Sequence, residues 1–224
     1  MLFRGVGMAV GTFLRKLFST REERGRVTSD RFRMAVRSVV RDMTADVSGR
    51  ILDAGGADGL MYDPEASTLS DNVTVLDLDC DSLRAGRRAY GEQGAFVCGD
   101  MTRMPFGDGV FDTAICVGTF YNFPSAELVA KGIAEMARVA DSGGTVILEF
   151  RNADNPVVSL AYRYAESYDP SLDGLTLRAY TVGEIALMVM RLGLVIKRIK
   201  YVGIPQRRLA IGFIVEAKKK NGKG

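Results

Sequence analysis

The first candidate site in this 224-residue chain combines an acidic residue with a cluster of glycines. Residues 51–59 run from an apolar stretch through Asp53 into a turn with Gly55, Gly56, Ala57 and Gly59. An apolar strand end would deliver a carboxylate to the edge of a sheet. Glycines let the backbone that follows bend sharply and approach a ligand without side-chain interference. We therefore predict that this turn binds a nucleoside.

The spacing of the small residues narrows the class of ligand. A dinucleotide fingerprint has glycines at relative positions one, three and six, which would fall here on Gly55, Ala57 and Leu60. The side chain of Leu60 is too bulky for the last position. The small residues fall instead at 55, 57 and 59, so the pattern does not favour a dinucleotide.

Two further carboxylates follow predicted strands. Residues 73–76 form a short apolar run that ends in Asp77, about 20 residues beyond the glycines, where an acid can accept hydrogen bonds from a ribose diol. Residues 96–98 form another run, followed by Gly99 and Asp100. A solvated carboxylate at a strand end is the alternative interpretation of Asp77.

These motifs resemble those of class I S-adenosylmethionine-dependent methyltransferases. The resemblance rests on the acid-x-Gly-x-small-x-Gly pattern at 53–59, the Gly-Asp pair at 99–100, the Met-Pro-Phe run at 104–106 and the Phe-Asp pair at 111–112. A helix, a Gly-Gly turn and a strand at 133–150 continue it. It covers residues 30–217, most specifically 51–150, and points to the group that includes quinone-biosynthesis enzymes.

The resemblance implies S-adenosylmethionine as the cofactor and assigns roles to single residues. Asp100 would bind the adenine amino group, and Met101 would lie against the ring. The implied cofactor-binding residues are Asp53, Gly55, Gly56, Ala57, Gly59, Asp77, Leu78, Asp100, Met101 and Val117.

The methyl acceptor is expected near the end of the fourth predicted strand. There, Tyr121 and Asn122 are the candidate catalytic residues, which would orient the acceptor or take its proton, although loop packing and turn formation explain them equally well. Residues 151–180 contain four tyrosines, and a long segment at this place is typical of a lid over the acceptor. Arg151 and Arg178 are candidate anion-binding residues within it.

The implied reaction is an in-line displacement at the sulfonium methyl group by an O, N, C or S atom. The chain has no histidine, so any proton transfer must use a carboxylate, Tyr, Lys, water or the substrate itself. Because the cofactor supplies the electrophile, the protein mainly positions two reactants and excludes water. No carboxylate cluster has metal-binding spacing, so we expect no metal.

The predicted fold is α/β, a doubly wound Rossmann-like sheet of seven strands, mostly parallel with an antiparallel last strand, and with helices on both faces. Strands are expected at 51–54, 73–77, 96–98, 111–117, 145–150, 194–201 and 209–217, and helices at 29–43, 81–91, 125–140 and 181–193. Residues 1–50 form a helical extension, 51–217 the cofactor domain with 151–180 as the acceptor lid, and 218–224 a disordered basic tail. A proline at position 64 predicts that the helix after the glycine-rich turn begins late.

Charge is distributed unevenly although the net charge is only +3. Basic and acidic residues number 11 and 5 in residues 1–50, 6 and 16 in 51–150, and 13 and 6 in 151–224. The acidic centre suits a cationic sulfonium, and the basic ends suit an anionic acceptor or membrane, or simply solubility. The small net charge makes a nucleic acid partner unlikely. The cysteines, Cys80, Cys98 and Cys116, are odd in number and lack Cys-x-x-Cys spacing, so we predict reduced, buried thiols in a cytoplasmic protein.

Two amphipathic stretches precede the glycine-rich turn. Residues 1–18 carry apolar side chains at helical spacing. This segment is too short and too charged to span a bilayer. This segment either caps the cleft or makes peripheral contact with a membrane. The second stretch has Arg33, Arg37 and Arg41 on one face, which we predict to be solvated.

Three classes of function stay open at this point. The first is methyl transfer to a small-molecule or lipid-like acceptor. The second is a non-methylating enzyme on the same scaffold, an aminopropyl transferase or a nucleotide-dependent oxidoreductase. The third is a catalytically silent binding protein, which would predict decay of the cofactor motifs. The oligomeric state is not predicted.

Overall fold

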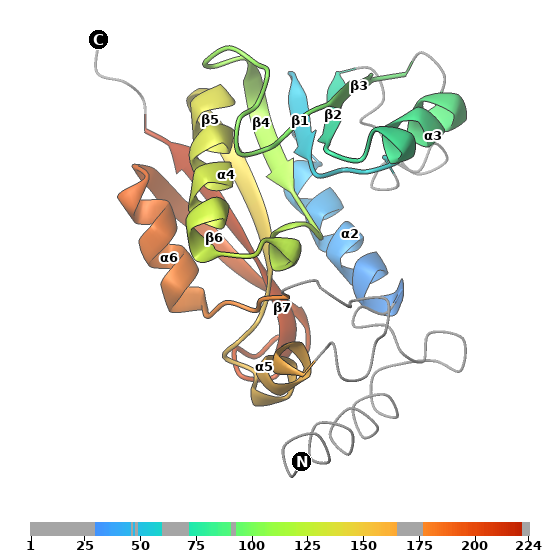
Figure 1. The fold of residues 1–224 in the computed structure, drawn as a ribbon. Coiled ribbons are helices and arrows are strands. Elements are labelled where there is room, and N and C mark those ends of the chain that lie inside the picture. Colours follow the sequence, from blue (N-terminus) through green and yellow to red (C-terminus); the bar gives the residue numbers. More distant parts are fainter. Residues whose placement is uncertain are drawn as a thin grey trace.

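A seven-stranded sheet forms the centre of the computed structural model, which describes residues 30–45, 47, 49–59, 72–90, 93–164 and 177–220 (Figure 1). Its strand order is β3-β2-β1-β4-β5-β7-β6. The strands are β1 (Ile51–Ala54), β2 (Val73–Asp77), β3 (Ala95–Cys98), β4 (Phe111–Cys116), β5 (Ala140–Arg151), β6 (Leu194–Gly203) and β7 (Ala210–Lys219). Strand β7 runs antiparallel to both neighbours, whereas the pairs among β1 to β5 are parallel. The predicted Rossmann-like fold is confirmed.

Helices cover both faces of this sheet. They are α2 (Asp30–Thr44), α3 (Cys80–Tyr90), α4 (Ala126–Val139), α5 (Pro156–Arg163) and α6 (Val182–Arg191), with a 3-10 turn, η1 (Phe120–Asn122). Helices α4 and α6 pack on one face and α2 on the other (Figure 1). Side chains alternate along the strands, so that Ala114 and Cys116 of β4 enter the first core layer while Ile115 enters the second.

Local signals place the helix starts that the sequence predicts. Ser125 caps α4 by accepting a hydrogen bond from the backbone of Leu128, and Thr181 forms a capping box with Glu184 at the start of α6. Gly193 follows α6 with a φ of 78°, a conformation that glycine adopts without strain.

Two local elements differ from the sequence prediction. The expected turn at 141–144 is a bulge inside β5, because Ala140 already pairs with Phe111 and Thr145 with Thr113, while Gly143 between them has a φ of 77°. Helix α5 was not predicted, although Asn155 caps it and Pro156 occupies its first turn. Both residues are typical of a helix start.

The cysteine prediction is wrong for two of the three residues. Cys80 and Cys98 form a disulfide, with 5.3 Å between their Cα atoms, and Cys98 is exposed. Strands β2 and β3 pair in parallel with Asp77 opposite Cys98, which brings the end of β3 beside the start of α3. This proximity follows from the sheet and cannot be seen in the spacing of the cysteines. Cys116 is buried and reduced, as predicted.

Several predictions fall outside the described residues. They concern residues 1–29, the late helix start near 64, part of the lid (165–176) and the end of the tail (221–224). Among the helices that the structure describes, none has the length and apolar character needed to cross a membrane.

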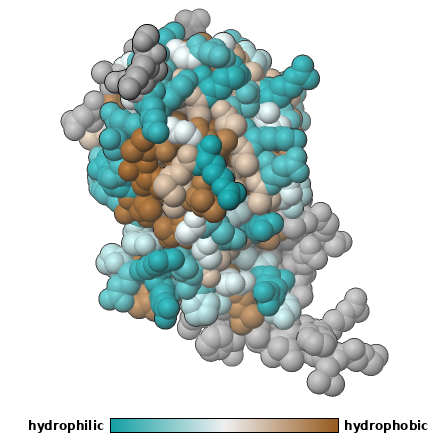
Figure 2. Space-filling view, turned by 90° about the vertical axis from the view of Figure 1, so that its left-hand side faces the viewer, coloured by the Kyte–Doolittle hydropathy of each residue, from teal (hydrophilic) through white to brown (hydrophobic). Residues whose placement is uncertain are grey.

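Apolar side chains reach the surface along the edge of the molecule formed by α6 and β6, which faces the viewer in Figure 2. Leu187, Met190 and Val195 are the exposed large side chains there. This edge lies at the opposite end of the sheet from β1, β2 and β3, and therefore away from the glycine-rich turn.

Candidate functional site

A pocket of about 190 Å³ lies between the glycine-rich turn and α2. Its walls are residues 55–58 after β1, Val117 and Gly118 after β4, and Glu149 and Arg151 at the end of β5. Strands β1 and β4 are neighbours at which the strand order reverses. The crevice outside the carboxyl ends of strands at such a reversal is the usual ligand site of open α/β sheets.

The glycine-rich turn leaves no room for side chains. Gly55 has a φ of 80° and donates its N–H to the carbonyl of Leu76 at 2.7 Å, and a Cβ atom on it would collide with Thr119. A Cβ atom on Gly56 would collide with the carboxylate of Asp53, which is buried beneath the turn. The two glycines therefore let the turn pack closely against Thr119 and Asp53, in the conformation that lines the pocket.

Asp77 holds the turn from the neighbouring strand. Its Oδ2 accepts the backbone N–H of Ala57 at 2.8 Å, and its Oδ1 accepts that of Asp79 at 2.9 Å. Ala57 has a φ of 48°, uncommon for a residue with a side chain. A carboxylate has about four lone-pair sites, so both oxygens keep capacity for a ligand.

The remaining predicted cofactor residues lie along the same edge, outside the pocket wall. Leu78 is 73% exposed beyond the end of β2. Asp100 is exposed and accepts the backbone N–H and the hydroxyl of Thr102, at 2.7 and 2.9 Å. Met101 is buried in the core layer that contains α4, and Gly59 packs near the ring of Phe96. The predicted set thus spreads from the pocket towards β3.

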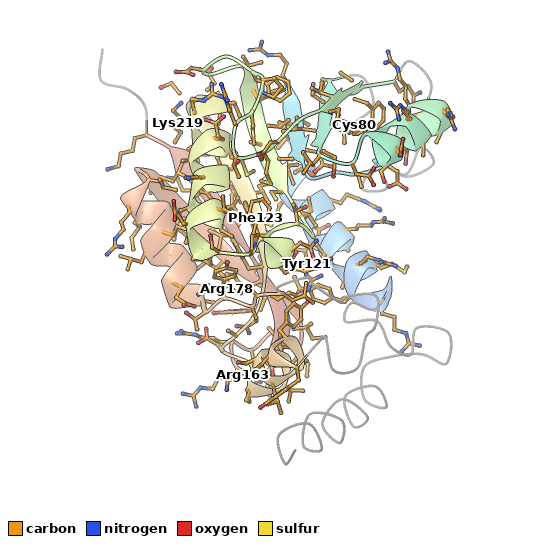
Figure 3. All side chains as sticks on the ribbon, viewed as in Figure 1. Cys80, Tyr121, Phe123, Arg163, Arg178 and Lys219 are labelled. Atoms are coloured by element: carbon orange, nitrogen blue, oxygen red, sulfur yellow. A yellow bond between two sulfur atoms is a disulfide. The ribbon has the colours of Figure 1, made fainter. Side chains whose placement is uncertain are left out.

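The structure separates the two predicted catalytic residues. Tyr121 lines the pocket, at the middle of the sheet edge in Figure 3, with its ring edge-on to Tyr162 at 6.2 Å between centroids. Asn122 is exposed, and its backbone N–H bonds to the carbonyl of Thr119 at 3.0 Å. Only Tyr121 of this pair is placed to meet a ligand in the pocket.

Arg151 forms the floor of the pocket with the carboxylate of Glu149. The Arg151 side chain is only 3% exposed, forms an ion pair with Glu149, and donates from Nε to the hydroxyl of Tyr162 at 2.8 Å. Its guanidinium lies between the rings of Phe32 and Tyr121, 4.4 and 4.6 Å from their centroids. A charged group in this position fixes the ring of Tyr121.

Burial and charge act in opposite directions on this guanidinium. Burial alone would lower the pKa of Arg151, but the carboxylate of Glu149 and the tyrosine hydroxyls raise it above its usual range. Arg151 therefore stays charged. Glu149 also accepts the backbone N–H of Gly118 at 3.0 Å, which ties the loop after β4 to β5.

Helix α2 supplies the wall opposite the glycine-rich turn. Phe32, Arg33, Val36 and Arg37 line the pocket, at helical spacings that share one face. Arg33 is exposed, as predicted, and Arg37 is half-buried, and both also line the rim of the pocket. The sequence analysis singles out neither Phe32 nor Glu149 as a site residue, although an acid within a buried strand is an informative signal.

Residues 177–180 return to the pocket from the predicted lid. Arg178 donates its backbone N–H to the carbonyl of Tyr121 at 2.9 Å. Tyr180 donates to the carbonyl of Arg151 at 2.9 Å and accepts from Ala153 at 2.8 Å. The segment therefore connects η1 with the end of β5.

Neither a cysteine nucleophile nor a metal site is supported within the described part of the chain. Burial, together with the negative charge of Asp53 and Glu149, raises the pKa of the Cys116 thiol well above its usual range, so it is not a nucleophile. No group of His, Cys, Asp or Glu residues there could hold a metal ion.

Comparison with known proteins finds sequence similarity to methyltransferases. Residues 52–148 match the family described as "Methyltransferase domain". Over 160 residues the chain is 28% identical to the ubiquinone/menaquinone biosynthesis C-methyltransferase of Hahella chejuensis, which covers 66% of this chain and 63% of that protein. Over 124 residues it is 34% identical to the protein of the same name from Methylobacterium nodulans, with coverages of 53% and 43%. The chain thus spans about half the length of these curated relatives.

A solved structure gives the same fold. The magnesium protoporphyrin IX methyltransferase of Synechocystis, solved with bound SAH, has a TM-score of 0.63 at 22% identity, covering 84% of this chain and 85% of that one. The matched domain spans the strands from β1 to β5 that carry the glycine-rich turn and the pocket. The chain is therefore similar in sequence to methyltransferases, most clearly over residues 52–148, and it shares their fold over most of its length.

Proposed function

We propose that this protein transfers a methyl group from S-adenosylmethionine to a small-molecule or lipid-like acceptor. The observation that carries the proposal is the pocket between the glycine-rich turn and the wall of Tyr121 and Arg151. A backbone cradle on one side and an aromatic, charged wall on the other are what a two-substrate transfer needs.

The residues at the sheet edge fit S-adenosylmethionine. Gly55 and Gly56 line the pocket in a turn that has no side chains at these two positions, and Asp77 and Asp100 present carboxylates at the ends of β2 and β3 for the ribose and the adenine. Leu78 and Met101 would flank the adenine, with Asp53, Ala57, Gly59 and Val117 completing the set. When bound, the cofactor supplies an electrophilic methyl group on a sulfonium centre.

The walls of the pocket indicate the class of acceptor. Phe32, Val36 and Tyr121 offer aromatic and aliphatic surface, which favours a flat, largely apolar molecule. Arg33 and Arg37 at the rim suit an ionised hydroxyl or another anionic group on it. The curated relatives are named for C-methylation in quinone biosynthesis, and a quinol-like acceptor meets both requirements.

The protein's own contribution is to position the acceptor and its proton. The hydroxyl of Tyr121 would orient the acceptor beside the methyl group or receive its proton, while Arg151 and Tyr162 hold the ring in place. Asn122 stays a prediction, because the structure places it at the surface. The shielded pocket floor would exclude water from the reacting atoms.

The membrane prediction needs its own test. We propose a cytoplasmic protein in which residues 1–18 either cap the cleft or contact a bilayer. Liposome flotation of the full chain and of a variant without residues 1–26 separates the two. Flotation lost on deletion supports membrane contact, and no flotation of the full chain contradicts it.

Calorimetric titration tests the cofactor directly. The full chain is titrated with S-adenosylmethionine, S-adenosylhomocysteine and NADH. We expect both adenosyl ligands to bind and NADH not to bind. Asp77→Ala should abolish binding because it removes both the ribose acceptor and the anchor of Ala57.

The matched control is Asp81→Ala, since Asp81 is an exposed acid on the adjacent helix that pairs with Arg84. This variant should bind like the parent protein. Binding of NADH alone, or of none of the three ligands, would overturn the proposed function. Binding of the adenosyl ligands then justifies a screen of quinol-like and other aromatic acceptors.

A further inference from the structure

A disulfide lies at the end of the sheet edge where the adenosine would bind. Cys80 is the first residue of α3, Cys98 is the last residue of β3, and their Cα atoms are 5.3 Å apart. Both sulfur atoms lie 3.8 Å from the carbonyl oxygen of Leu78. The bridge therefore joins the turn between β2 and α3 to the neighbouring strand.

The bridge is surrounded by the residues assigned to the adenosine. Asp77 lies opposite Cys98 in the pairing of β2 with β3, and Asp100 follows Cys98 by two residues. Leu78 stands between Asp77 and the bridge and is largely exposed. Figure 3 shows Cys80 beside α3, away from Tyr121 and the pocket floor. The disulfide thus acts on the cofactor end of the site and not on the acceptor end.

The two bridged sulfurs differ from the third cysteine in accessibility. Cys98 is exposed and Cys80 is half-buried, whereas Cys116 lies inside the core. Thiol–disulfide exchange requires that an attacking sulfur reach its target. A reagent in solution can therefore reach the pair while Cys116 stays protected.

We propose that Cys80 and Cys98 form a reversible modification site, whose oxidation by a low-molecular-weight disulfide tightens the binding of the adenosyl cofactor. With oxidised glutathione, the thiolate of Cys98 attacks one glutathione sulfur, forms a mixed disulfide and releases one reduced glutathione. The thiolate of Cys80 then attacks the sulfur of Cys98 and releases the second. The protein dithiol loses two electrons and two protons, and one oxidised glutathione becomes two reduced molecules.

The effect on affinity follows from ordering the turn before the ligand arrives. The bridge fixes residues 77–80 against β3, and Asp77 on this turn also anchors Ala57 of the glycine-rich turn. When the bridge is reduced, ligand binding must order these side chains itself. Ordering one or two side chains corresponds to an affinity loss of about 2- to 10-fold.

The experiment compares the full chain equilibrated with reduced or oxidised glutathione. Intact mass, after alkylation of free thiols, counts how many cysteines are bridged, and calorimetry gives the Kd for S-adenosylhomocysteine in each state. We expect one bridge between Cys80 and Cys98 in the oxidised sample and a Kd about 2- to 10-fold lower than in the reduced sample. Cys80→Ser and Cys98→Ser should each show the weaker Kd in both samples.

Cys116→Ala is the matched control and should respond to glutathione like the parent protein. Should a serine variant fail to fold, the two states of the parent protein decide the matter alone. The inference is overturned if excess oxidised glutathione forms no bridge, or if the bridge forms and the Kd is unchanged. Because it rests on the proposed function, absence of binding in both states would overturn the two together, whereas equal binding in both states overturns only this inference.

Discussion

The two sides of the pocket differ in the groups that give them their shape. On the side of β1 and β2, backbone groups make the shape: Gly55 donates to the carbonyl of Leu76, and Ala57 donates to Asp77. The residues involved follow one another closely along two neighbouring strands. What this side requires is the absence of side chains at a few positions.

On the side of β4 and β5, side chains make the shape. The buried pair of Glu149 and Arg151 meets the rings of Phe32, Tyr121 and Tyr162, which come from three other elements. What this side requires is that each charged or polar group finds its partner. The comparison teaches that a single substitution should harm the two sides through different physical causes.

The largest effect is expected from Glu149→Ala. It leaves the guanidinium of Arg151 buried without its carboxylate, which costs about 3–5 kcal/mol of unfolding free energy. Urea denaturation measures this loss. The control is Glu127→Ala, which removes an exposed pair with Lys131 and should cost less than about 1 kcal/mol. Equal losses in the two variants would contradict a buried charge pair at the pocket floor.

The backbone side is tested by Gly55→Ala. An L-residue with a φ near 80° costs roughly 1–2 kcal/mol, and collision with Thr119 adds to this. Gly193→Ala is the control, because Gly193 has a φ of 78° but no neighbouring atom within 4 Å of the added Cβ. Gly55→Ala should lower the unfolding free energy more than Gly193→Ala does, and it alone should weaken S-adenosylhomocysteine binding in calorimetry. Unchanged binding would show that the turn does not approach the ligand.

Tyr121→Phe separates the role of the Tyr121 hydroxyl in the reaction from the packing of its ring. The ring that packs against Arg151 and Tyr162 is retained, so the unfolding free energy and cofactor affinity should stay nearly constant. If the hydroxyl orients the acceptor or takes its proton, kcat should fall by roughly 10- to 100-fold, measured with the acceptor found in the screen. Tyr201→Phe removes a hydroxyl on β6, outside the pocket wall and the predicted lid, and should leave kcat unchanged. A Tyr121→Phe variant with full activity would remove Tyr121 from the mechanism.

The smallest effect is expected from the ion pair of Glu135 and Arg138, which lies away from the pocket. It shows how little a partly exposed pair contributes compared with the buried pair of Glu149 and Arg151. Hydrogen bonds from Arg138 hold the pKa of Glu135 below its ordinary value of 4.5. A carboxyl whose pKa is lower in the folded state contributes stability above its unfolded pKa and loses it as the pH falls through the folded pKa. Glu135→Gln should therefore lower the unfolding free energy by about 1 kcal/mol at neutral pH, and the difference from the parent should shrink below about pH 4.5. A difference independent of pH would exclude this carboxylate as the cause.

The same contrast explains what could be predicted from the sequence. The turn at 55–59, the strand that ends in Asp77 and the caps at Ser125 and Thr181 depend on neighbours within a few residues, so local patterns predict them. Helix α5 has equally local signals in Asn155 and Pro156. The sequence analysis places this segment in a lid and predicts no helix there, although the signal is present.

Other features depend on the sheet bringing distant residues together. Arg151 meets Phe32 only because α2 packs across the end of β5, and Cys98 meets Cys80 only because β2 and β3 are neighbours. No spacing in the sequence encodes either contact. For this reason local patterns predict the glycine-rich turn, whereas they do not predict the contacts of Arg151 on the opposite wall of the pocket.

The anchored ends of the predicted lid have an evolutionary consequence. Helix α5 ends at Arg163, and the chain is fixed again at Arg178 and Tyr180 by backbone bonds to Tyr121 and Arg151. The entropy of closing a loop grows only slowly with its length, so insertions or substitutions between these anchors should disturb the cofactor cradle little. If the segment between these anchors contacts the acceptor, as the lid prediction has it, descendants of this chain could exchange one acceptor for another by changing a dozen residues while the glycine-rich turn is inherited intact.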